Sequence, residues 1–78
     1  MNDNKQIETA DKVAAIINNV DSDCNARVWA KGNMVRVYTA KGYAIIDNEC
    51  NCNIDGLGGY CYKAALYCDD NGIKTYRA

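Results

Sequence analysis

The stretch that decides the fold is ARVWAKGNMVRVYTAKGYAIID, residues 26–47. Small aliphatic side chains alternate along it with cationic and aromatic ones, and the alternation breaks at Gly32-Asn33 and at Lys41-Gly42. Alternation with a period of two predicts strands with two different faces, and glycine-containing pairs favour tight reversals between them. The stretch therefore predicts an antiparallel β meander with strands near 26–31, 34–40 and 43–47.

Helices are predicted on both sides of the meander. The first spans residues 4–19, where Ile7, Ala10, Ala14 and Ile17 recur at helical spacing and Val13 and Val20 widen the apolar stripe. The second spans about 59–71 and ends before Gly72, a residue type that often terminates helices. Its expected buried face comprises Leu57, Tyr60, Cys61, Ala64, Tyr67 and Cys68.

A fourth strand is expected after the meander, with Cys50, Cys52 and Ile54 on its inward side. The glycine-rich DGLGG, residues 55–59, then predicts a reversal into the second helix. The fold class that follows is α+β, in a single domain over residues 1–78. It has an N-terminal helix, a three- to four-stranded antiparallel meander and a C-terminal helix, with both helices on one face of the sheet.

Composition argues against catalysis. The chain has no histidine and a single serine, so most nucleophilic and acid–base arrangements lack their members. The scattered carboxylates are spaced for turns and helix caps. We therefore expect a protein that is not an enzyme and that needs no cofactor.

The N-terminus, MNDNKQIETADK, has neither the basic nor the apolar region of a secretory signal. No apolar run approaches the roughly 20 residues that span a bilayer. The five cysteines are an odd number, and thiols normally stay reduced in the cytosol. These features predict a cytoplasmic protein that does not enter a membrane.

The number of cysteines raises the question of a metal site, but their spacing argues against one. Their spacing from Cys50 onward is C-x-C-x₈-C-x₆-C, without the paired knuckles of a structural zinc site. Cys61 and Cys68 lie two helical turns apart, about 10 Å along the axis, which is too far for one ion. A buried structural role explains them better. One metal alternative stays open, in which Cys50, Cys52 and Cys61 meet as three thiols.

The charge of the chain is nearly balanced, with a net value of −1. Residues 1–39 carry five basic and five acidic side chains, and residues 40–78 carry four and five. Nucleic-acid-binding proteins usually have an excess of Lys and Arg, which makes a nucleic-acid partner less favoured.

The most informative feature is the outward side of the predicted sheet. If the small aliphatic set meets the helices, the other side displays Arg27, Trp29, Lys31, Arg36, Tyr38 and Tyr43. Trp, Tyr and Arg dominate protein-interface hot spots, and they also form platforms for single-stranded nucleic acid. A third interpretation is that the aromatic rings pack on the stems of Arg and Lys as a small second core.

The chain resembles a population of small orphan proteins encoded by phages and other mobile elements. The resemblance lies in its size, its order of elements, the RVWAKGNMVRVYTAKGYAIID meander and the AALYCDDNGI segment of the second helix. Anti-CRISPR and other anti-defence inhibitors belong to that population. The resemblance implies a protein that blocks a host protein or protein complex with one surface and without chemistry. The second partner that we consider is another copy of the same chain, in a homodimer.

Overall fold

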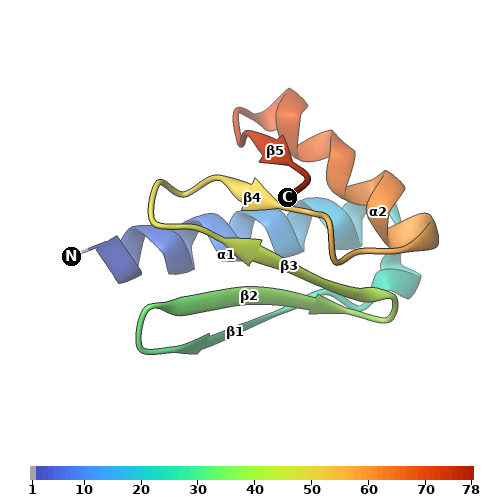
Figure 1. Cartoon of the computed structure of the whole chain (residues 1–78). Helices are drawn as coiled ribbons and strands as arrows, with labels where there is room; N and C mark the ends of the chain where they lie inside the picture. The colour runs from blue at the N-terminus through green and yellow to red at the C-terminus, as the bar shows by residue number, and fades with distance from the viewer. Residues whose placement is uncertain (1) are drawn as a thin grey trace.

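The computed structural model describes residues 2–78, with side chains from residue 4 onward. Its elements are α1 (Asn2–Val20), the 3₁₀ helix η1 (Ser22–Cys24), β1 (Arg27–Lys31), β2 (Met34–Thr39), β3 (Gly42–Ile46), β4 (Cys52–Asn53), α2 (Gly59–Ala65), the 3₁₀ helix η2 (Leu66–Asn71) and β5 (Thr75–Tyr76). α1 runs along one face of the sheet and α2 packs against α1 (Figure 1). The predicted α+β class and the three strands of the meander are confirmed.

The sheet has five strands in the order β1-β2-β3-β4-β5. The first four pair antiparallel, as the sequence predicts, whereas β5 pairs parallel with β4 through Cys52↔Thr75 and Asn53↔Tyr76. The fifth strand exceeds the three to four expected. β4 is the predicted fourth strand, shortened to Cys52–Asn53, whereas the two residues of β5 are too few to show an alternation that predicts a strand.

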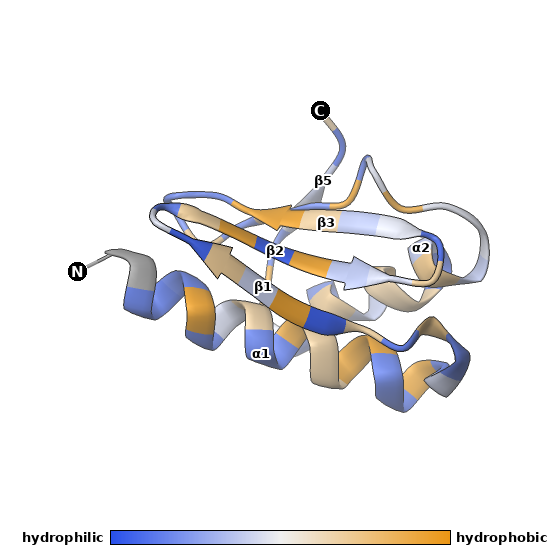
Figure 2. Cartoon of the chain, turned by 90° about the horizontal axis from the view of Figure 1, so that it is seen from below, coloured by the Kyte–Doolittle hydropathy of each residue, from blue (hydrophilic) through white to orange (hydrophobic). Residues whose placement is uncertain are grey.

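The core lies between the sheet and the helices. Its buried apolar side chains come from α1, β2, β3, β4, α2 and the connecting segments, in one continuous cluster. Figure 2 shows hydropathy alternating along β1 and β2 above α1, while β3 becomes continuously apolar toward its end. One polar side chain joins this core, because the amide of Gln6 donates a 3.0 Å hydrogen bond to the carbonyl oxygen of Ile46. This bond ties α1 to the end of β3.

Two expectations for buried positions on the first helix and strand were wrong. Val20, placed in the apolar stripe, is 43% exposed at the last position of α1. Ala30, placed on the inward face, is exposed because the whole end of the β1–β2 hairpin, residues 29–34, lies outside the core.

Further corrections concern the segments after the meander. Cys50 is not an inward strand residue: it has a φ of 63° in the turn before β4 and is half-buried. The second helix is α-helical only to Ala65 and continues as 3₁₀ helix. That change of pitch rotates the side chains after Ala65, and Tyr67, expected on the buried face, is exposed. Tyr60, at the second position of α2, is exposed as well, while Ala65 is buried.

A close approach of two glycines fixes the turn after β4. A side-chain carbon at Gly42 would lie 2.0 Å from the carbonyl oxygen of Gly56, and one at Gly56 would lie 2.6 Å from the carbonyl oxygen of Tyr43. The N–H of Gly58 also donates to the carbonyl of Lys41 at 2.8 Å. The DGLGG stretch is thus a reversal, as expected, and it is clamped to the β2–β3 hairpin.

Candidate functional site

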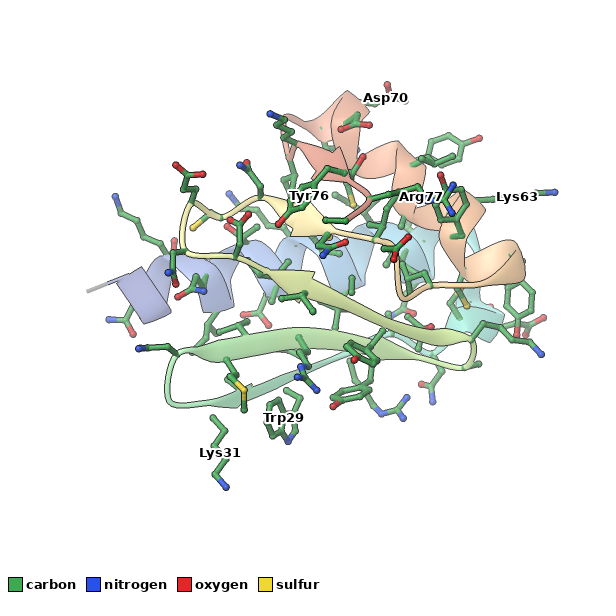
Figure 3. The ribbon with its side chains drawn as sticks, viewed as in Figure 1. Trp29, Lys31, Lys63, Asp70, Tyr76 and Arg77 are labelled. Carbon is green, nitrogen blue, oxygen red and sulfur yellow. The ribbon has the colours of Figure 1, made fainter. Side chains whose placement is uncertain are left out.

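The side of the sheet that faces away from α1 gathers all six residues that the sequence singled out. Strand register places Arg27 beside Tyr38 and Tyr38 beside Tyr43. The next row along the strands is Trp29, Arg36 and Ile45, and a third row pairs Lys31 with Met34. We call this set the outer face: Arg27, Trp29, Lys31, Met34, Arg36, Tyr38, Tyr43 and Ile45. Trp29 and Lys31 project from β1 away from α1 (Figure 3).

Arg36 lies at the centre of the outer face. Its guanidinium carbon lies 5.7 Å from the ring centroid of Trp29 and 4.8 Å from that of Tyr43. Its Nη1 donates a 3.2 Å hydrogen bond to the hydroxyl of Tyr38. The hydrogen bond to Tyr38 raises the pKa of Arg36, while partial desolvation acts against it. One cation is therefore held by three aromatic side chains.

The aromatic rings also contact one another. Tyr38 meets Trp29 edge to face, with ring centroids 6.1 Å apart, and Tyr43 at a tilted 5.3 Å. These geometries are the favoured ones for aromatic pairs. Since the rings and the guanidinium restrain each other, little side-chain freedom remains to be lost when a partner binds.

The outer face is also more apolar than the sequence analysis indicated. Met34 is 49% exposed, and Trp29 and Ile45 are each 36% exposed. Met34 and Ile45 were not among the predicted site residues, although the alternation of their strands assigns them to this side. They were not predicted as site residues because Met and Ile are apolar, and such residues are most often found in a core.

Basic residues are concentrated in the meander. Residues 24–46 carry Arg27, Lys31, Arg36 and Lys41 and no acidic side chain, while the rest of the chain carries five basic and ten acidic ones. Counting charge in two halves of the sequence concealed this asymmetry. The meander is therefore cationic in a protein whose net charge is −1.

The far end of the sheet is polar and tied together by hydrogen bonds. The hydroxyl of Tyr76 donates to Oδ2 of Asp47 at 2.8 Å, and Oδ1 of Asp47 accepts from the N–H groups of Glu49 and Asn51. Burial acts to raise the pKa of Asp47, but these donors outweigh it and the pKa lies below its usual value. Asp47 therefore closes the turn before β4, which is a structural role.

The structure does not bring the cysteines together as the three-thiol metal alternative requires. Cys24, Cys52, Cys61 and Cys68 are each 0% exposed, while Cys50 lies apart in its turn. Burial first, and then the neighbouring thiol of Cys61, raise the pKa of Cys24 to about 12. Within residues 2–78, no three His, Cys, Asp or Glu side chains form a group that could hold a metal ion.

A second exposed apolar area lies on α2 and η2. Tyr60, Leu66 and Tyr67 are 38%, 42% and 52% exposed, and Lys63 and Asp70 flank a shallow depression beside Leu66 and Tyr67. Figure 3 shows Lys63 and Asp70 pointing into solvent from this region. None of these side chains is restrained by a cluster such as that around Arg36, so this area serves as a comparison surface.

Comparison with known proteins gives no match to a family model, to a curated protein or to a solved structure. Over residues 2–78, no helix combines the length and apolar character needed to cross a membrane.

Proposed function

We propose that this chain is a non-catalytic protein-binding module that contacts its partner through the outer face. The observation that carries the proposal is the position of Arg36, held between Trp29 and Tyr43 on the side of the sheet that the helices leave open. Trp, Tyr and Arg contribute most of the energy of typical protein interfaces. Exposed Met34 and Ile45 extend the same surface with apolar area.

The outer face favours a protein partner over single-stranded nucleic acid. Bases bind such platforms by stacking on open aromatic faces beside basic groups. Here the guanidinium of Arg36 already lies against the rings of Trp29 and Tyr43. The overall charge of −1 also provides little long-range attraction for phosphate. A local second core without a partner would not need the neighbouring Met34 and Ile45 to be exposed.

The resemblance to small inhibitors encoded by phages and other mobile elements extends this proposal to a biological role. The partner would then be a host protein or a component of a host defence complex, in the cytoplasm. The module would act by occupying a surface that the host protein needs, without modifying it. Such a mode of action requires a stable, preordered surface and no catalytic group.

Site-specific photo-crosslinking tests the proposal. A photoreactive phenylalanine analogue is placed at Ile45 on the outer face or at Tyr67 on η2, and each protein is irradiated in a lysate of the cells in which the chain acts. We expect a discrete crosslinked protein from position 45 that disappears when unlabelled wild-type chain competes. Crosslinking of one protein from position 67 but not from position 45 would contradict the proposal.

A further inference from the structure

β1 is an edge strand with one free side. Within residues 2–78 it pairs only with β2, from Arg27↔Tyr38 to Lys31↔Met34, across the two-residue turn Gly32-Asn33. The residue pair that flanks such a turn exchanges hydrogen bonds, and bonding direction then alternates along the strand. The backbone groups of residues 27, 29 and 31 therefore point toward β2. Those of Val28 and Ala30 point away from the sheet.

A side chain already occupies the start of this free edge. The amide of Asn18 accepts from the N–H of Ala26 at 2.7 Å and donates to the carbonyl oxygen of Ala26 at 2.9 Å. This pair of contacts is the one that a neighbouring strand would make, and it lies on the side opposite β2. Since Val28 and Ala30 follow Ala26 at steps of two, their N–H and C=O groups face the same way. Two residues of the edge are thus open beyond the one that Asn18 covers.

The charges around the free edge select against a second copy of the chain. An antiparallel self-pairing that uses both open residues places Val28 opposite Ala30 of the other copy. The same register places Arg27 opposite Lys31 of the other copy, twice. Like charges directly opposite one another destabilise a strand pair.

The same charges favour an acidic strand. Arg27 and Lys31 flank Trp29 on the outer face of β1, Arg36 lies beside Trp29 on β2, and residues 24–46 contain no acidic side chain. A strand laid along β1 would place alternate side chains next to those of residues 27, 29 and 31. An acidic, an apolar and an acidic residue at those positions would match the cation, the ring and the cation.

We propose that the free edge of β1 takes an extended acidic segment of the partner protein as an additional antiparallel strand. The backbone of Val28 and Ala30 supplies four hydrogen-bonding groups, and Arg27 and Lys31 select the acidic sequence. This proposal rests on the proposed function, because it names the element of the partner that the module contacts. The outer face and the added strand would form one continuous binding surface around Trp29.

The probe is a capped seven-residue peptide, TETVTET, added at up to millimolar concentration to the ¹⁵N-labelled full chain. Saturable NMR shifts and slowed amide exchange are expected at Val28 and Ala30. The control peptide TKTVTKT should bind at least about tenfold more weakly, which corresponds to about 1.4 kcal/mol. A third peptide, N-methylated at the two inner threonines, cannot donate to the edge and should leave both amides unchanged.

Three variant proteins complete the experiment. In the double variant Arg27→Glu and Lys31→Glu, the preference should switch to TKTVTKT, while Lys41→Glu, outside the edge, should keep the wild-type preference. Ala30→Pro removes one open N–H and should therefore abolish binding. The variant should still fold, because proline is tolerated on the solvent side of an edge strand. If Ala30→Pro does not fold, the N-methylated peptide makes the same test on the wild-type chain.

Several outcomes would overturn the inference. One is equal binding of the two charged peptides, and another is a lack of change at the Val28 and Ala30 amides at millimolar TETVTET. Self-association of the chain through β1 would also overturn it. So would oligothymidylate that binds at these amides in place of the peptide. Peptide-induced shifts confined to the indole N–H of Trp29 and the backbone amides of Tyr38 and Tyr43 would overturn the strand addition and leave the protein-binding outer face intact. Failure of the crosslink at position 45 would instead count against the proposed function itself.

Discussion

The guanidinium carbon of Arg36 lies 4.8 Å from the centre of the Tyr43 ring, its diagonal neighbour across the β2–β3 pair, in which Arg36 pairs with Ile45 and Tyr43 with Tyr38. The guanidinium also contacts the Trp29 ring on its other side, and these contacts partly desolvate it. Arg36 thus contacts two rings and the Tyr38 hydroxyl, whereas the cation–π contact elsewhere on the surface joins Arg77 to the single ring of Tyr62.

Replacing this arginine should cost little stability. For Arg36→Met we expect the free energy of unfolding to fall by about 1 kcal/mol, because a cation–π contact at an exposed site contributes about 0.5–1 kcal/mol. Urea denaturation measures the change. Arg27→Met is the matched control, since among the side chains from residue 4 onward its guanidinium bonds only to the carbonyl oxygen of Asn25, and it should have almost no effect. A loss above about 3 kcal/mol for Arg36→Met would identify the cluster as a second core.

Two glycine substitutions should differ sharply. Gly42→Ala combines a φ of +95° with a contact of 2.0 Å to the carbonyl oxygen of Gly56, so we expect a loss of about 3 kcal/mol or more in unfolding free energy. Gly32→Ala has a φ of +59° and no atom within 4 Å, and it should cost about 1–2 kcal/mol. Thermal denaturation compares the two variants. Equal destabilisation would show that the clamp between residues 42 and 56 is not formed.

One thiol should react before the others. Burial raises the pKa values of Cys24 and Cys52 to about 12 and that of Cys68 to about 11, which suppresses their thiolate forms. Cys61 is fully buried, whereas Cys50 lies half-buried in a turn. Iodoacetamide labelling of the native protein, read by peptide mass spectrometry, should therefore modify Cys50 first. Early modification of Cys61 would contradict the packing described for α2.

Acid should weaken the fold through Asp47. The folded-state pKa of Asp47 lies below the ordinary value of 3.8, so its contribution is present above that value and is lost as the pH falls through the folded pKa. The hydrogen bond to Asp47 is also the main reason that the pKa of Tyr76 is raised. Urea midpoints measured from about pH 6 to about pH 2 should therefore fall more steeply for wild type than for Asp47→Asn. Parallel pH profiles would contradict this role.

Tyr76→Phe is the matched control for the acid measurement. It removes one of three donors to Asp47 and leaves the N–H groups of Glu49 and Asn51 in place. Its pH profile should fall between those of the wild type and Asp47→Asn. A profile identical to that of Asp47→Asn would mean that the two backbone donors contribute nothing.

The fold could be predicted from the meander because its alternation and its two glycine-containing turns determine strand positions and sidedness together. The grouping of Trp29, Arg36, Tyr38 and Tyr43 on one side follows from the same alternation. The contacts within that group could not be predicted, because the register of one hairpin against the next decides which residues become neighbours. Sequence spacing does not give that register when turn lengths are ambiguous.

Other features depended on contacts between distant segments. Asn18 lies in the last turn of α1, close to the expected helix end, and its side chain also bonds to Ala26 just before β1. The parallel strand β5 forms only because the segment after η2 returns beside β4. Neither contact has a local pattern of its own. The cationic meander could have been found from the sequence, by counting charges along residues 24–46 and not in halves.

The measurement that tests the central claim most directly is the affinity of the crosslinked partner for the double variant Trp29→Ala and Tyr38→Ala. Tyr67→Ala, which removes an exposed ring from η2, is the control. We expect the double variant to stay folded, with a small change in Tm, and to bind the partner at least about 30-fold more weakly, as hot-spot truncation predicts. Tyr67→Ala should bind like wild type. A double variant that melts at a much lower temperature yet keeps its affinity when folded would contradict the account, because Trp29 and Tyr38 would then be core residues.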